Sequence, residues 1–148
     1  MRSAIVDRPL APTALVAEVS APDCGAVVLF VGTVRDTNDG RAVTGIEYSS
    51  YRTMAERELA TIVDESATRF HGARVVAEHR VGMLGLGEAS VAIAVAHGHR
   101  GAAYEASRYV IEEIKRRLPI WKREHYADGT REWVHARSGT ARTPEPVA

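Results

Sequence analysis

The chain has 148 residues, of which 45% are hydrophobic and 26% charged, the balance of an ordinary folded domain. Basic side chains (Lys plus Arg) number 19 and acidic ones 19, so the formal net charge is zero, which argues against a general nucleic-acid or membrane-surface binder. The single cysteine, Cys24, excludes an internal disulfide and a cysteine-type zinc site. We therefore expect a cytoplasmic protein without metal, cofactor, nucleic acid or membrane partner.

The first third of the chain predicts two strands joined as a hairpin. The run from Gly25 to Val34 is rich in Val, Leu and Phe, which indicates a buried strand. Residues 35–41 are polar and hold turn residues, so they predict a loop. Residues 43–51 alternate loosely, as in a strand that returns beside the first. Upstream, the pattern predicts an edge strand at 4–6 and a helix that Thr13 caps.

The rest of the chain predicts two long helices with strands around them. Thr53 and Glu56 have the spacing of a capping box for a helix that ends before Gly72. A second helix runs from about Ala102 to Leu118, where Pro119 stops it. Strands are predicted at 74–83, 89–97, 120–126 and 131–135, the last two as a hairpin. This order indicates an α+β fold in which residues 1–137 form one domain and 138–148 a flexible C-terminal tail.

Two polar segments adjoin predicted element ends. Arg35 follows the first long strand, and a strand end is a rigid mount for a side chain; position alone equally fits a solvated loop arginine. His99 and Arg100 precede the second long helix, and backbone N–H groups at a helix N-terminus favour anions. The alternative is a polar linker. His97 and His99 also suggest a metal, but no third ligand stands nearby in the sequence.

Two lysines flank Pro119. Lys115 borders the apolar stripe of its helix, where a lysine commonly extends its amine to solvent and has no further role. Lys122 and Glu124 share one face of the following strand, and Arg123 lies on the other. A partly buried lysine among cations can lose its proton near neutral pH and become a base or nucleophile.

Taken in order, these segments resemble the large, catalytic subunit of molybdopterin synthase from about Gly25 to Arg137. The resembling stretches are Gly25–Val28, Phe30–Arg35, Val63–Glu65, His79–Gly82, His99–Arg100 with Ala103–Ala106, Lys115 with Pro119 and Trp121–Glu124, and Trp133–Val134 with Ala136–Arg137. No single stretch is decisive, but the ordered series at these spacings is specific.

The resemblance implies an α/β hammerhead-type single domain with an antiparallel or mixed sheet, working as a homodimer. Each large subunit would bind one small, ubiquitin-like sulfur carrier, giving a heterotetramer. The carrier's Gly-Gly C-terminus, activated as a thiocarboxylate, would deliver sulfur to cyclic pyranopterin monophosphate. The product is the molybdopterin dithiolene, a step of molybdenum cofactor biosynthesis, so residues 1–137 would be a catalytic domain with sulfurtransferase activity.

The resemblance also implies residue roles. Lys115 and Lys122 would be catalytic, and Arg137 would lie near the carrier's tail. The pterin site would be lined by Thr33, Val34, Arg35, His99, Arg100, Lys122, Arg123 and Glu124. Thr33 stands where some family members carry a lysine, so we expect it to contribute through its backbone.

Two other classes of function remain as alternatives. A non-enzymatic regulatory module could hold a phosphorylated metabolite without a lysine of altered pKa. A purely structural subunit would leave the cation pattern unexplained. The discriminating observation is whether Lys115 and Lys122 converge with the arginines in one pocket.

Overall fold

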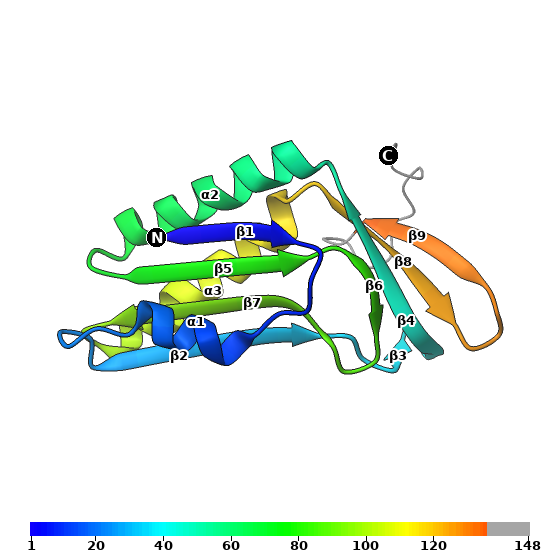
Figure 1. Ribbon diagram of the computed structural model, residues 1–148, viewed down its shortest axis with the longest axis horizontal. Helices are drawn as coiled ribbons and strands as arrows, with labels where there is room; N and C mark the ends of the chain where they lie inside the picture. The colour runs from blue at the N-terminus through cyan, green and yellow to red at the C-terminus, as the bar shows by residue number, and fades with distance from the viewer. Residues whose placement is uncertain (136–148) are drawn as a thin grey trace.

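The computed structural model describes residues 1–135 of the chain (Figure 1). The helices are α1 (Pro12–Val19), α2 (Arg52–Arg69) and α3 (Arg100–Arg117). The strands are β1 (Arg2–Val6), β2 (Ala26–Thr33), β3 (Thr37–Asn38), β4 (Arg41–Ser50), β5 (Arg74–Arg80), β6 (Gly82–Gly85), β7 (Ala89–His97), β8 (Ile120–Tyr126) and β9 (Arg131–His135). No helix within residues 1–135 combines the length and apolar character that a membrane span requires.

The strands form two sheets. The first has the order β1-β5-β7-β2, with β1 parallel to β5 and the other pairs antiparallel. The second has the order β3-β4-β8-β9, with β6 also paired to β4, and all of its pairs are antiparallel. Its long strands cross one end of the first sheet like the head of a hammer (Figure 1). The predicted α+β hammerhead fold is confirmed, and so is the β8–β9 hairpin.

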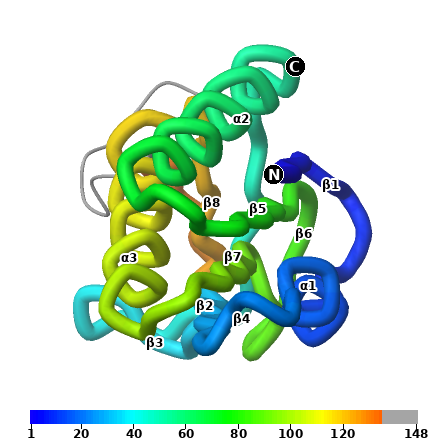
Figure 2. Tube along the Cα trace, turned by 90° about the vertical axis from the view of Figure 1, so that its left-hand side faces the viewer, coloured from blue at the N-terminus to red at the C-terminus, as the bar shows by residue number. Residues whose placement is uncertain are grey.

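Helices cover both faces of the first sheet. Figure 2 shows α1 on one face and α2 with α3 on the other. The larger core lies on the side of α2 and α3, where Leu59, Ile93 and Val110 are 0% exposed. Leu15 and Val19 of α1 form a smaller core against the opposite face. The first sheet is therefore a rigid layer on which α3 is fixed.

The sequence of α3 explains where it ends. Ala103, Ala106 and Val110 recur at helical spacing and are buried against the sheet. Basic residues occupy the last turn, where their positive charges interact favourably with the negative end of the helix dipole. Leu118 is extended (φ −67°, ψ 129°), as expected before Pro119, and β8 follows at once. Lys115 and Lys122 therefore lie on two rigid elements joined by a short link.

The predicted hairpin between residues 25–34 and 43–51 is wrong. β2 pairs with β7, whereas β4 pairs with β8 and β6. The chain leaves the first sheet after Val34, whose N–H donates to the Glu88 carbonyl and whose carbonyl accepts from the Gly87 N–H. β2 is consequently an edge strand, and most of its residues are half-buried rather than buried.

Four local predictions also fail. The expected strand 74–83 divides at Val81, whose N–H bonds to the Val6 carbonyl (2.8 Å), and β6 then joins the second sheet. The capping box does not form, because α2 begins at Arg52 without a side-chain cap and Glu56 instead pairs with Arg52. Thr13 does not cap α1, which starts at Pro12. Within the predicted loop 35–41, the short strand β3 forms.

Candidate active site

A pocket of about 470 Å³ lies where the end of β2 and the C-terminal half of α3 meet β4 and β8 of the second sheet. Its volume falls in the range of small-molecule sites. Five of the residues singled out in the sequence line it: Thr33, Arg35, Lys115, Lys122 and Glu124. Segments that are distant in the chain thus bring three basic side chains and a carboxylate into one pocket. The sequence alone could not show whether Lys115 and Lys122 converge with an arginine, and in the structure they converge with Arg35.

The two lysines occupy different electrostatic surroundings. Burial by the surrounding protein, and then the charge of Lys122, lower the pKa of Lys115 below its usual 10.5. The residue itself keeps exposed surface at the pocket, so its amine is accessible to a ligand. Lys122 instead forms an ion pair, with its Nζ 3.2 Å from Glu124 Oε1. Burial and the charge of Lys122 both make it easier for Lys115 to lose its proton, whereas Lys122 is held in an ion pair.

Glu124 is the buried carboxylate around which the polar side chains of the pocket are arranged, with only 1% of its surface exposed. Asn38 Nδ2 donates to both carboxylate oxygens at 2.8 Å, and the Tyr126 hydroxyl donates to Oε2 at 2.7 Å. Burial alone would raise the pKa of Glu124, but these hydrogen bonds and the charge of Lys122 outweigh it and lower the pKa. A buried carboxylate with this many donors holds Lys122 in a fixed geometry.

Uncharged groups form the floor of the pocket. Tyr48 lines it, and its ring meets the buried His79 edge-on, with ring centroids 5.4 Å apart. The pKa of His79 is lowered to about 4, mainly by burial and to a smaller extent by the charge of Lys115, against a hydrogen bond to the Arg80 carbonyl that raises it. Burial raises the pKa of Tyr48. Lys115 therefore shares the pocket with the Tyr48 side chain, and the charge that acts on it is that of Lys122.

Other predicted site residues lie elsewhere. Val34 is buried behind the pocket at 3% exposure. Arg123 points to the opposite face of the second sheet, where it pairs with Glu47 and lies over the Trp133 ring at 4.9 Å. Arg137 lies outside the described residues.

His99 and Arg100 lie at the other end of α3. Arg100 is fifteen residues from Lys115, which at 1.5 Å per residue separates their Cα atoms by ~22 Å. The His99 N–H donates to His97 Nδ1 at 3.0 Å. Within one chain, these two residues therefore do not reach the pocket. No metal-binding group of three His, Cys, Asp or Glu side chains occurs among residues 1–135.

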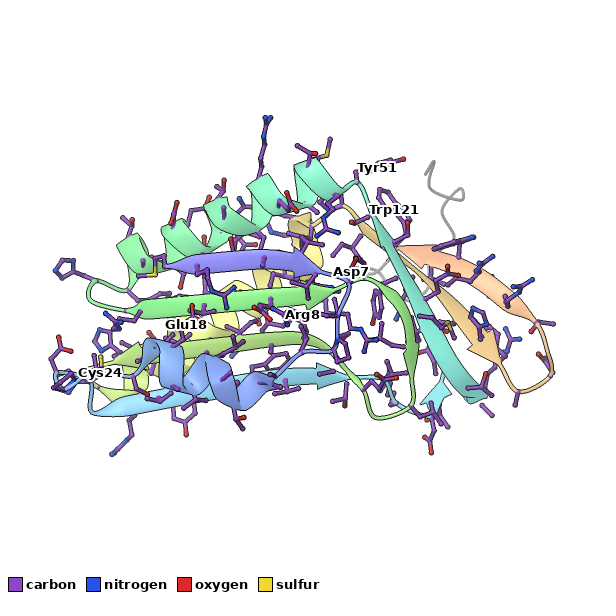
Figure 3. All side chains as sticks on the ribbon, viewed as in Figure 1. Asp7, Arg8, Glu18, Cys24, Tyr51 and Trp121 are labelled. Atoms are coloured by element: carbon purple, nitrogen blue, oxygen red, sulfur yellow. The ribbon has the colours of Figure 1, made fainter. Side chains whose placement is uncertain are left out.

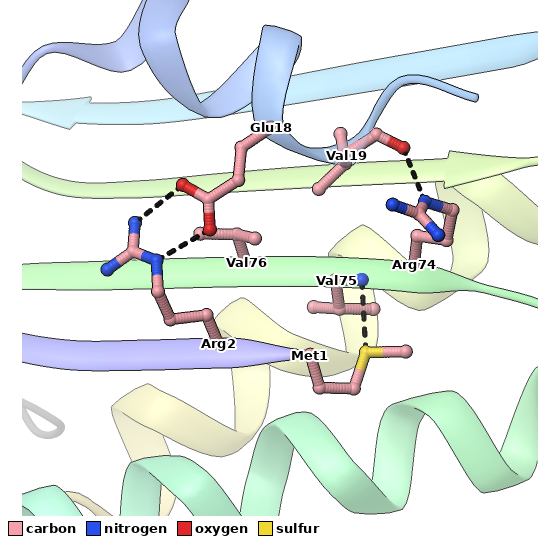
Figure 4. A pocket seen from close by; sticks show the side chains of 7 residues that line it. All are labelled: Met1, Arg2, Glu18, Val19, Arg74, Val75 and Val76. Carbon is pink, nitrogen blue, oxygen red and sulfur yellow. Dashed lines mark hydrogen bonds and ion pairs between the residues drawn. The ribbon is translucent and has the colours of Figure 1, made fainter.

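A second pocket, of about 220 Å³, lies beside the N-terminus between α1 and β5 (Figure 4). Its charged groups already have partners, because Arg2 pairs with Glu18 at 2.6 Å and Arg74 donates to the Val19 carbonyl at 2.8 Å. It contains no lysine. These contacts tie α1 to the sheet, so this pocket is not the candidate site.

Sequence reasoning missed several pocket residues. The sequence around Asn38 indicates only a turn, and its role depends on the carboxylate of Glu124, 86 positions away. Tyr48 and Ser90 sit on strands whose pairing the sequence did not reveal. The only available signal was that each is a polar side chain in a predicted strand, at an alternating position that faces the predicted core.

Comparison with known proteins decides the family. The model of the MoaE protein family matches residues 5–117. The chain belongs to the MoaE family. A relative from Thermoplasma volcanium, named molybdopterin synthase catalytic subunit, is 42% identical over 129 residues, which covers 87% of this chain and 94% of the relative. A Bacillus subtilis protein of the same name is 41% identical over 133 residues, covering 90% of this chain and 84% of that protein.

Solved structures of MoaE-type proteins share the fold. Molybdopterin synthase from Staphylococcus aureus superposes with a TM-score of 0.84 at 37% identity, covering 88% of this chain and 95% of the other. A complex of subunits 1 and 2 of molybdopterin-converting factor from Helicobacter pylori gives 0.72 at 22% identity, with 92% and 90% covered, and shows the fold alone. The comparisons give the regulatory-module alternative no support.

Proposed function

We propose that this MoaE-family chain is the catalytic subunit of a molybdopterin synthase, a sulfurtransferase acting in the cytoplasm on cyclic pyranopterin monophosphate. The observation that carries the proposal is the pairing of Lys115 with Lys122 in one pocket, with the pKa of Lys115 lowered. A site that only binds a phosphorylated metabolite needs cations but not an amine that can lose its proton.

The geometry fits the chemistry of sulfur transfer. The thiocarboxylate sulfur of a carrier bonds to a pterin side-chain carbon as a carbon–oxygen bond of that carbon breaks. At one of the two carbons the oxygen leaves with the phosphate as the cyclic ester opens, and at the other it leaves as water. Water then hydrolyses the resulting thioester, which leaves sulfur on the pterin and a carboxylate on the carrier. Lys115, as a neutral amine, accepts a proton from the water that attacks the carrier's acyl carbon when the thioester is hydrolysed. Lys122, held by Glu124, stabilises the negative charge that develops on oxygen or sulfur. Two such transfers yield the dithiolene.

The substrate phosphate needs fixed cations. Arg35 supplies one at the pocket, and its fork of donors suits phosphate. His99 and Arg100 are too distant within the same chain. We propose that they serve the pocket of a second copy in a homodimer, which reconciles their assignment to the pterin site with their place in the fold. Thr33, Glu124 and Arg137 keep the roles that the resemblance implies as predictions. Val34 and Arg123 are left out of the proposed pterin site, because neither lines the pocket.

The sulfur comes from a partner in this proposal. The H. pylori protein was solved as a complex of two different subunits, which supports a small carrier subunit here as well. Its Gly-Gly C-terminus would enter the lysine pocket as an extended tail. Because the chain has no net charge, local clusters of basic side chains must attract the two anions, which are the carrier's tail and the substrate phosphate.

Reconstitution tests the proposal. The purified chain, a thiocarboxylated carrier and the cyclic pterin are mixed, and dithiolene product is measured by mass spectrometry. We expect product with the complete mixture, and none when the chain is omitted or when the carrier ends in a plain carboxylate. Tight pterin binding without product in the complete mixture would instead favour the binding-module alternative.

A further inference from the structure

A tight hairpin joins β3 to β4 at one end of the second sheet (Figure 1). Asn38 pairs with Arg41, and only Asp39 and Gly40 lie between them. Both turn residues have a positive φ, 49° for Asp39 and 75° for Gly40, which is typical of a two-residue type I′ turn. Residues opposite each other across such a hairpin share one face. The turn therefore holds the side chains of Asn38 and Arg41 next to each other.

These two side chains contact two residues of β8 that also share a face. Glu124 and Tyr126 are two positions apart in the strand, and the Tyr126 hydroxyl donates to Glu124 Oε2 at 2.7 Å. Asn38 Nδ2 donates to both carboxylate oxygens of Glu124 at 2.8 Å. The Arg41 guanidinium lies over the Tyr126 ring, 3.4 Å from its centroid. The four residues form a closed circuit of contacts, which we call the hairpin clamp.

The outer end of the hairpin clamp is fixed to the β8–β9 turn. Arg41 donates to the Thr130 hydroxyl at 2.7 Å, and its guanidinium lies 3.4 Å from the Asp128 carboxylate. The carboxylate of Glu132, which pairs with Glu124 across β8 and β9, is 3.8 Å from the same guanidinium. The clamp is thus attached to both strands of the β8–β9 hairpin, and its position follows from theirs.

The inner end of the hairpin clamp is the carboxylate that pairs with Lys122. A carboxylate offers roughly four acceptor positions, and the donors of Asn38 and Tyr126 occupy most of them. Oε1, which Tyr126 leaves free, is the oxygen 3.2 Å from Lys122 Nζ. Burial, and then the hydrogen bond to Glu124, raise the pKa of Tyr126 to about 12. Both donors of the clamp are therefore uncharged near neutral pH, and Lys122 is the charged partner of Glu124.

We propose that Asn38 and Tyr126 are positioning residues for sulfur transfer, which hold Glu124 so that Lys122 keeps its charge at one place in the pocket. This inference rests on the proposed function, because it names the residues that fix the electrostatic lysine. Glu124 is only 1% exposed, so water cannot replace a donor that is removed. The carboxylate then turns or takes up a proton, and either response weakens the ion pair with Lys122. Tyr126 does not line the pocket, so it acts through Glu124.

Single-turnover sulfur transfer tests the proposal, with the full chain, a thiocarboxylated carrier and the cyclic pterin. Asn38→Ala and Tyr126→Phe should each lower the rate about tenfold or more, which corresponds to one hydrogen bond to a charged group. Binding of the cyclic pterin should change by less than about threefold. Asp39→Asn is the matched control from the same turn, because asparagine also tolerates a positive φ, and it should keep at least half of the wild-type rate.

Asn38→Asp gives a signature that a purely structural role would not produce. The new carboxyl group has the shape of the amide but faces the Glu124 carboxylate, and two ionised carboxylates repel each other. When the new group is protonated, its O–H replaces the donor of the amide. The rate relative to wild type should therefore rise at least about fivefold from about pH 8 to about pH 5.5, whereas the relative rate of Asn38→Ala should stay constant. Lys122, Arg41 and Glu132, the charged groups around this pair, are the same in both variants.

The other outcomes overturn the proposal. Near-normal rates in Asn38→Ala and Tyr126→Phe would do so, as would a relative rate of Asn38→Asp that does not depend on pH. A loss of pterin binding as large as the loss of rate would make Asn38 a direct substrate contact instead. If circular dichroism shows Asn38→Ala unfolded, Tyr126→Phe decides, because it keeps the ring under Arg41 and removes only the hydroxyl. An inactive wild type would refute the proposed function, whereas an active wild type with unaffected variants would refute only the hairpin clamp.

Discussion

Lys122 has a carboxylate 3.2 Å from its amine, that of Glu124, whereas Lys115 shares the pocket without an ion pair among residues 1–135. Because only one of the two lysines has an ion pair, we expect these chemically identical side chains to have different roles. The ion-paired lysine is a fixed positive charge, and its charge in turn helps to lower the pKa of the other. In the proposed mechanism, one pocket thus holds a fixed positive charge at Lys122 and a proton acceptor at Lys115.

The pH dependence of sulfur transfer should report this coupling. A rate that needs neutral Lys115 rises with pH through the pKa of that amine, which lies below the usual 10.5 because of burial and the charge of Lys122. Lys122→Met removes that charge, so the inflection of the single-turnover rate should move to higher pH, besides any loss of rate. Arg123→Gln, on the far face of the second sheet, is the control and should leave the inflection in place. An unmoved inflection in Lys122→Met would refute the coupling.

Arg35 and Arg123 form a matched pair of arginines on opposite sides of the second sheet. Arg35 lines the pocket, and Arg123 pairs with Glu47 outside it. A charge-assisted hydrogen bond contributes ~1.5–3 kcal/mol, so Arg35→Ala should weaken binding of the cyclic pterin by roughly 10- to 100-fold in titration calorimetry. Arg123→Ala should change it by less than about threefold. Equal losses in the two variants would contradict the placement of the phosphate at Arg35.

His79 should make the fold sensitive to acid. Its pKa is about 4 in the folded chain against 6.5 as the ordinary value, so between these pH values the unfolded chain binds a proton that the folded chain does not. The free energy of unfolding should therefore fall by ~3 kcal/mol from this group as pH drops from 6.5 to 4. In urea titrations, His79→Gln should show a flatter dependence over this window, even if it is less stable at pH 7. Parallel curves for the two proteins would exclude the buried neutral histidine.

Cys24 should be dispensable. It lies at the end of the first sheet remote from the β4–β8 head of the fold (Figure 3). Burial, and then the neighbouring charge of Asp23, raise the pKa of its thiol, which disfavours the thiolate. Cys24→Ser should keep at least half of the wild-type turnover with a thiocarboxylated carrier. Complete loss of turnover in a folded Cys24→Ser protein would mean that sulfur passes through this chain's own cysteine.

The sequence predicted elements better than their pairing. Apolar periodicity placed α3, and Pro119 fixed its end, so the spacing of Lys115 from the following strand followed from local rules. Pairing depends on contacts between distant segments, and the hairpin error arose because Val34 bonds to the loop before β7, more than fifty residues later. The boundary of the C-terminal tail lies outside the described residues.

The candidate site divides in the same way. Alternation in a strand correctly put Lys122 and Glu124 on one face and Arg123 on the other. The remaining wall could not be predicted, because Asn38 reaches Glu124 only through the packing of β3 against β4. The distance of His99 from the pocket also follows from the whole length of α3 and not from any motif.

Replacement of Lys115 tests the account most directly. Single-turnover sulfur transfer is measured for wild-type, Lys115→Ala and Lys115→Arg proteins, with carrier binding and thermal melting as controls for folding. Because arginine keeps the charge but cannot lose its proton, both variants should bind the carrier yet lose at least ~10²-fold in rate, the scale of lost acid–base catalysis. Near-normal turnover of Lys115→Arg would contradict a proton-transfer role and leave this lysine only an electrostatic one.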